Sequence, residues 1–124
     1  MKYNLFLDDI RIPNDILYYK INPFYKKRKW VIVKSYDEFV NYINKYGLPN
    51  LISYDHDLAD IQYVANYDEY IEKTRYDALK WVCNYCLDNK LKIPIMVFHT
   101  ANIIGEKNMK TYYNNFKKFN PDLI

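Results

Sequence analysis

The sequence predicts an α/β domain in which helices cover a mostly parallel β-sheet. Short apolar segments typical of buried strands alternate with segments of helical periodicity, in the order β-β-α-β-α-β-α. Three of the apolar segments end in polar side chains that can carry out chemistry. In open α/β sheets, ligands bind along the edge formed by the carboxyl ends of the parallel strands, so we expect a site there.

Two short strands begin the chain. Residues 4–9 form an apolar run that predicts a buried strand, and Trp30–Val33 predicts a second. The stretch between them, residues 10–29, holds Pro13 and Pro23. Any helix in this first crossover is therefore expected to be short.

A helix with clear start and stop signals follows the second strand. Ser35 is a suitable N-cap, and Glu38 stands three residues later, as in a capping box. Gly47 and Pro49 are typical of the end of a helix. The residues expected on its buried face are Phe39, Val40, Ile43 and Tyr46.

The second half of the chain continues the alternation. Residues 51–55 predict the third strand, and residues 58–73, which have no clear period, predict a loop or an irregular helix. A helix is expected from about Arg75 to Asn89, then a strand over Pro94–Phe98 and a last helix from Gly105. The positions expected to face inward are Ala78, Leu79, Val82, Cys83, Cys86 and Leu87 in the first of these helices, and Met109, Tyr112, Tyr113 and Phe116 in the second.

The bulk composition indicates one domain spanning residues 1–124. A net charge of +3 permits an anionic ligand without requiring one. No apolar run approaches the ~20 residues of a membrane span, and the N-terminus carries no secretory signal. We expect a cytoplasmic protein of a bacterium or a virus-infected cell, with no membrane association and no evident obligate protein partner.

The two cysteines have the Cys-x-x-Cys spacing but not its usual context. Cys83 and Cys86 lie inside a helical pattern, whereas a redox pair sits at a helix N-terminus directly after a strand. No second cysteine pair or nearby histidine pair completes a zinc site. We therefore interpret both as core residues.

Four carboxylates follow two of the predicted strands. Asp8 and Asp9 come after the first strand, and Asp55 and Asp57 come at the end of the third. Crowded carboxylates repel each other, so a bound cation is a physical reason to bring them together. Oxygen ligands suit Mg²⁺ or Mn²⁺ better than zinc. The alternative is that these residues cap loops and helix starts.

Both histidines of the chain lie in the same strand tails, His56 between the two acids and His99 after the fourth strand. Each can act as a general acid or base near neutral pH, and the alternative for each is a hydrogen-bonded packing role. We favour proton transfer for His99. For His56 both interpretations stay open, because strand alternation directs it away from Asp55 and Asp57.

Further polar residues could bind an anion beside the acids. Arg11 could clamp a phosphate in a bidentate manner, or could keep the acid pair ionised. Asn102, Gly105 and Asn108 surround the start of the last helix, where free backbone N–H groups favour an anion. Ordinary turn and cap roles are the alternative for Asn102 and Gly105.

The strand tails resemble those of response-regulator receiver domains. The shared features are the acid pair Asp8-Asp9, Asp55 at the end of the third strand, and Thr100 after the fourth. This resemblance implies that the acid pair binds Mg²⁺, that Asp55 accepts a phosphoryl group, and that Thr100 contacts it. Receivers also need a lysine after a fifth strand, and residues 103–124 contain no convincing fifth strand.

A longer set of motifs is similar to the cyclic-phosphate-processing receiver-like domains. The matching segments are Leu7–Pro13, Ser53–Leu58, Tyr76–Trp81 and His99–Asn102, together with Gly105, Asn108 and Met109. This resemblance implies a receiver-like, flavodoxin-like fold of three layers, and a ligand bearing a cyclic phosphate, such as an RNA end or a cyclic nucleotide. Two departures stand out: residues 59–73 are long, and Arg75 stands where a glycine is expected.

Together these observations predict a sheet of about four strands in the order 2-1-3-4, without the fifth. The first functional hypothesis is Mg²⁺- or Mn²⁺-assisted phosphodiester chemistry, in which Asp8, Asp9, Asp55 and Asp57 are candidate ligands of the metal. His99 would be the general acid or base, with His56 as a second candidate and Arg11, Thr100 and Asn102 on the phosphate. The alternatives are a cyclic-nucleotide-binding module without turnover and a phospho-accepting signalling receiver.

Overall fold

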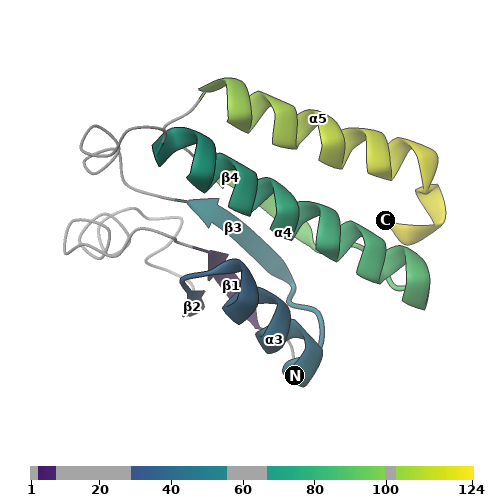
Figure 1. Cartoon of the computed structure of the whole chain (residues 1–124). Helices are drawn as coiled ribbons and strands as arrows, with labels where there is room; N and C mark the ends of the chain where they lie inside the picture. Colours follow the sequence, from purple (N-terminus) through teal and green to yellow (C-terminus); the bar gives the residue numbers. More distant parts are fainter. Residues whose placement is uncertain (1–2, 8–28, 56–66, 100–102) are drawn as a thin grey trace.

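Four parallel strands form one sheet in the order β2-β1-β3-β4, as the sequence predicts. The computed structural model describes residues 3–7, 29–55, 67–99 and 103–124. Its α/β architecture, drawn in Figure 1, confirms the receiver-like fold class. The elements are β1 (Asn4–Leu7), β2 (Trp30–Val33), α3 (Tyr36–Tyr46), β3 (Leu51–Asp55), α4 (Tyr67–Asn89), β4 (Ile95–His99), α5 (Ile103–Phe119) and the short 3₁₀ helix η2 (Pro121–Leu123).

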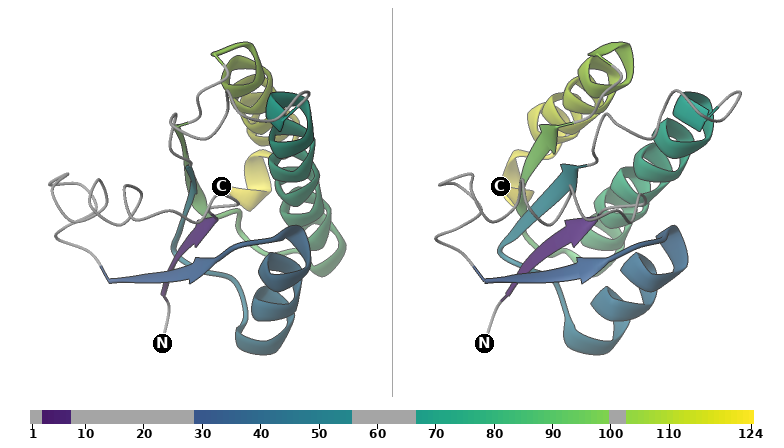
Figure 2. Two further views of the ribbon diagram at one scale, coloured as in Figure 1. Left: turned by 60° about the vertical axis from the view of Figure 1, so that its left-hand side comes forward. Right: turned by 90° about the vertical axis from the view of Figure 1, so that its left-hand side faces the viewer.

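The three described α-helices all lie on one side of the sheet, as Figure 2 shows. Alternate residues of the strands point into this layer, and Leu5, Ile52 and Tyr54 are completely buried there. On the opposite face Phe6 is buried, but Ile95 is 66% exposed at the β4 edge. The predicted crossover between β1 and β2 lies outside the described residues, except for Lys29.

Helix α3 begins and ends where its signals predict. The hydroxyl of Ser35 accepts a hydrogen bond from the Glu38 N–H at 3.1 Å. The Glu38 carboxylate accepts from the Lys34 N–H at 3.1 Å, one residue before its partner in a standard capping box. Gly47 has φ +87° and donates its N–H to the Ile43 carbonyl.

Helix α4 starts earlier than predicted. It begins at Tyr67, so the predicted start at about Arg75 is wrong, and residues 67–73, expected to form a loop or an irregular helix, are part of the helix. Three acids, Asp68, Glu69 and Glu72, interrupt the apolar residues of this part of the sequence, and its short period was not recognised as helical. The residues predicted to be buried in its second half are buried, with one exception: Leu87 is 47% exposed. Likewise Tyr46, placed on the buried face of α3 by its spacing, is 56% exposed at the helix end.

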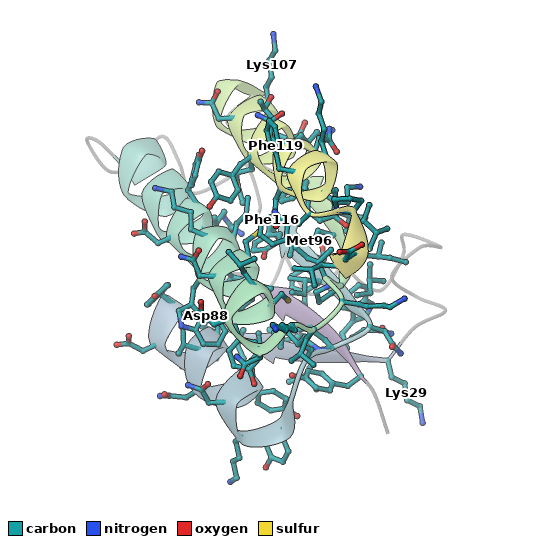
Figure 3. All side chains as sticks on the ribbon, turned by 90° about the vertical axis from the view of Figure 1, so that its right-hand side faces the viewer. Lys29, Asp88, Met96, Lys107, Phe116 and Phe119 are labelled. Atoms are coloured by element: carbon teal, nitrogen blue, oxygen red, sulfur yellow. The ribbon has the colours of Figure 1, made fainter. Side chains whose placement is uncertain are left out.

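Helix α5 packs against β4 and is followed by the short helix η2. It begins at Ile103, two residues before the predicted start. Met109 and Tyr113 are buried, and the Tyr113 hydroxyl donates to the Pro94 carbonyl at 3.0 Å. In Figure 3, Phe116 and Met96 lie between α5 and the sheet. Residues 103–124 contain only α5 and η2, so no fifth strand follows β4 in this stretch.

Candidate functional site

The carboxyl ends of β1, β3 and β4 lie next to one another at one edge of the sheet. Leu7, the last residue of β1, pairs with Tyr54 of β3. One residue further on, Asp55 of β3 pairs with His99, the last residue of β4. Neighbouring strands are about 4.8 Å apart, so the backbones of Asp55 and His99 are held within one strand spacing. The acid pair Asp8-Asp9 directly follows Leu7 in the sequence.

Two helices begin at the same edge. Figure 1 shows the amino ends of α4 and α5 at the end of the sheet to which the strands point. The first turn of a helix presents backbone N–H groups and a partial positive charge. The first turn of α5 contains Gly105, which is buried. Asn108 lies about one turn later and is exposed. Two helix ends that favour anions thus lie at the sheet edge where Asp55 ends β3.

The predicted site residues divide into two groups. The structure describes the backbones of Asp55 and His99 and the positions of Gly105 and Asn108. The others lie outside the described residues, so their roles stay predictions. They are Asp8, Asp9, Arg11, His56, Asp57, Thr100 and Asn102.

A fully buried arginine at this edge was not recognised in the sequence as a site residue. Arg75 of α4 has no exposed surface, and its Nη1 donates a hydrogen bond to the Leu7 carbonyl at 3.0 Å. The sequence did contain a signal. Arg75 stands three residues before Ala78 and four before Leu79, so it lies on the same helix face as the buried residues of α4. An arginine on the buried stripe of a helix calls for an electrostatic explanation.

The cysteines belong to the core, as predicted. Cys83 and Cys86 are both buried, and they are free thiols. Burial raises the pKa of Cys83 from 9.0 to about 12 and the pKa of Cys86 to about 11. A reactive cysteine needs a lowered pKa and access to solvent, so these thiols are inert packing residues.

The donor chemistry at the edge suits a hard cation, although the described part of the chain contains no cluster of three or more metal-ligating side chains. Three of the four predicted carboxylate ligands lie outside the described ranges. The fourth, Asp55, ends the strand adjacent to the one that leads into the acid pair. Aspartate oxygens on adjacent strand tails are the donor type that Mg²⁺ binds, so the residues fit that ion by chemical type.

A parallel sheet of this order, with acids after β1 and at the end of β3, defines a receiver-like α/β domain. The family model of the cyclic-phosphate processing receiver domain matches residues 3–115. The chain belongs to this family, which confirms the resemblance seen in its motifs. No curated protein and no solved structure matches the chain significantly. None of the helices within the described ranges is long and apolar enough to cross a membrane.

Proposed function

We propose that the carboxyl edge of the sheet carries out metal-assisted hydrolysis of a cyclic phosphate on a nucleotide or an RNA end. The observation that supports this most is the register between Asp55 and His99 at the ends of adjacent strands. This register places the backbones of an aspartate and a histidine side by side at the carboxyl edge of the sheet. The acid pair Asp8-Asp9 follows the end of β1 in the sequence. Membership of the cyclic-phosphate processing receiver family supplies the ligand class.

The proposal assigns roles by residue type. Asp8, Asp9 and Asp55, with Asp57 as a further candidate, would hold Mg²⁺ or Mn²⁺. Such an ion, when bound, would neutralise charge on the phosphoryl oxygens. Arg11, Thr100 and Asn102 would hold the phosphate, and the first turn of α5 near Gly105 would add backbone N–H donors.

The proposed reaction opens the cyclic diester with water. A water oxygen forms a new bond to phosphorus while one ring P–O bond breaks. A base at the site removes a proton from the water, and the departing ribose oxygen takes up a proton. His99 is the candidate for one of these transfers and His56 for the other, because imidazoles exchange protons near neutral pH. The product is a phosphomonoester with a free hydroxyl group.

Binding without turnover is the second candidate. Two helix N-termini at the same edge favour an anion whether or not chemistry follows. A binding module would saturate with its cyclic nucleotide and release it unchanged. A phospho-accepting role for Asp55 is less favoured, because residues 103–124 provide neither a fifth strand nor the lysine that follows it in receivers.

A product assay separates these functions. Oligoribonucleotides ending in a 2′,3′-cyclic phosphate, and cyclic mono- and dinucleotides, are incubated with the protein with and without Mg²⁺. Hydrolysis appears in the mass spectrum as the gain of one water, and a binder returns its ligand at the original mass. Incubation with a small phosphodonor, followed by intact-mass analysis of the protein, detects a phosphoryl group on Asp55. Absence of both turnover and binding across the panel contradicts the proposal.

A further inference from the structure

Arg75 of α4 places a permanent positive charge inside the domain. Arg75 is among the largest fully buried side chains, and all the other α4 residues on its stripe that the structure describes are apolar or cysteine. A guanidinium stays charged at every physiological pH. Burying such a charge is costly unless negative charge and hydrogen-bond acceptors lie close by.

The position of the guanidinium is fixed by a contact that spans 68 residues of sequence. Its Nη1 donates to the carbonyl oxygen of Leu7, the last residue of β1. The next two residues of the chain are Asp8 and Asp9. Arg75 is therefore anchored to the strand end from which the acid pair continues.

We propose that Arg75 is a positioning residue of the acid site, which fixes the end of β1 and balances part of the charge of Asp8 and Asp9. A protein-borne cation at this place offsets the mutual repulsion of the carboxylates when no metal is bound. It also competes electrostatically with a divalent ion. Arg75 therefore lowers the affinity of the site for a divalent metal ion. This inference rests on the proposed function only for the location of the acid site.

The burial of Arg75 decides between this role and direct phosphate binding. A residue with no exposed surface cannot meet an incoming ligand without rearrangement of its surroundings, whereas it can act on neighbouring carboxylates through space. An exposed cation on the same helix provides a matched control. Lys80 is exposed, and its Nζ lies 4.8 Å from the centre of the Tyr76 ring.

The test compares Mg²⁺ binding to wild type, Arg75→Gln, Arg75→Lys and Lys80→Gln by titration calorimetry at low ionic strength, without any phosphate ligand. We expect Arg75→Gln to bind Mg²⁺ roughly tenfold more tightly or better, because one unit of opposing charge has gone. Arg75→Lys and Lys80→Gln should stay within about threefold of wild type. Unchanged or weaker binding by Arg75→Gln would overturn the proposal.

A second measurement does not need an Arg75 variant to fold. Asp8→Asn and Asp9→Asn are unfolded thermally without metal, beside Asp55→Asn. If the acid pair balances Arg75, at least one of the first two variants leaves a buried cation undercompensated and melts lower by about 5 °C or more. If both melt at or above the wild-type temperature, the role is wrong. Neither the Mg²⁺ titration nor the thermal unfolding uses a cyclic phosphate. Both can therefore be interpreted even if the hydrolysis assay shows no turnover.

Discussion

Asp55 and His99 are register partners at the ends of two adjacent parallel strands, although 44 residues separate them in the chain. The intervening helix α4 is what allows this: it crosses the sheet and returns the chain in parallel. The pairing fixes the backbone of a carboxylate beside that of an imidazole. Two chemically different residues therefore end adjacent strands at one edge of the sheet.

Replacing Asp55 by asparagine tests the metal role of this edge. Mg²⁺ should raise the melting temperature of wild type, since a ligand that binds only the folded state stabilises it by mass action. Asp55→Asn should lose most of this shift. Without metal it should be as stable as wild type or more stable, because like-charge repulsion is relieved. Lower metal-free stability with an intact Mg²⁺ response would instead mean that Asp55 is a structural cap.

Replacing His99 by alanine separates an enzyme from a binder. If His99 transfers a proton, turnover should fall by roughly 10²–10⁴-fold while ligand binding changes far less. The pH–rate profile should also lose one ionisation near neutrality. If wild type itself shows no turnover and His99→Ala changes only the dissociation constant, the protein is a binding module. Titration calorimetry beside the product assay on both proteins distinguishes the outcomes, and a loss of folding stability alone would mean a packing role.

Periodicity and cap chemistry were sufficient to predict most of the described fold. The Trp30–Val33 strand and the Ser35 cap followed from local signals that the tertiary structure preserves. The order of the four strands was expected from the resemblance to receiver domains, and the structure confirms it. The first turns of α4 were not recognised in this way, because acids at three of the seven positions 67–73 obscure the short helical period of the segment. Leu87 has the spacing of a buried residue but lies near the end of α4, where 47% of it stays exposed.

The site was predictable at the level of strand tails and not at the level of side-chain contacts. Sequence order places acids and histidines after strands, and the parallel topology then brings the tails to one edge. The contact between Arg75 and Leu7 depends on the three-dimensional packing of α4 over β1. A motif comparison marks Arg75 as a departure from glycine that would alter the rim of the pocket, and it does not predict the buried hydrogen bond to Leu7.

The buried thiols predict a loss of stability at alkaline pH. Burial raises the pKa of Cys83 to about 12 and that of Cys86 to about 11, so the folded state keeps both protonated while the unfolded chain ionises near pH 9. The contribution of the two buried thiols to the free energy of unfolding is complete below about pH 9, and it is lost as the pH rises towards 11 to 12. Burial also raises the pKa of Tyr54, which adds to the loss above about pH 10.

Urea unfolding between pH 8 and pH 11 measures this effect. Wild type should lose stability steadily over the range, and Cys83→Ala should show a shallower pH dependence despite its lower stability at pH 8, where it leaves a small cavity. Lys92→Gln, an exposed change beside the last turn of α4, is a surface control and should follow the wild-type slope. An identical slope for Cys83→Ala and wild type would contradict the burial of this thiol.

Two residues with positive φ in the described part of the chain predict opposite responses to substitution. Gly47 has φ +87° and ψ 179°, a backbone region open almost only to glycine, and an added Cβ would meet no atom within 4 Å. Gly47→Ala should therefore cost roughly 1–3 kcal/mol of unfolding free energy through backbone strain alone. Lys90 has φ +55°, so Lys90→Gly should leave stability unchanged or raise it by up to about 1 kcal/mol. Equal losses for both variants in urea unfolding would contradict the two backbone conformations.

The most direct test of the central claim is a map of where a cyclic phosphate binds. In ¹H–¹⁵N spectra of the Mg²⁺-loaded protein, titration of an oligoribonucleotide with a 2′,3′-cyclic phosphate end should shift the amide signals of Asp55, His99 and Gly105 at the carboxyl edge. The amides of Asn50 and Ile95, at the amino ends of β3 and β4, should stay in place. Shifts confined to Asn50, Ile95 and their neighbours, or no shifts with any cyclic phosphate tested, would contradict a site at the carboxyl edge.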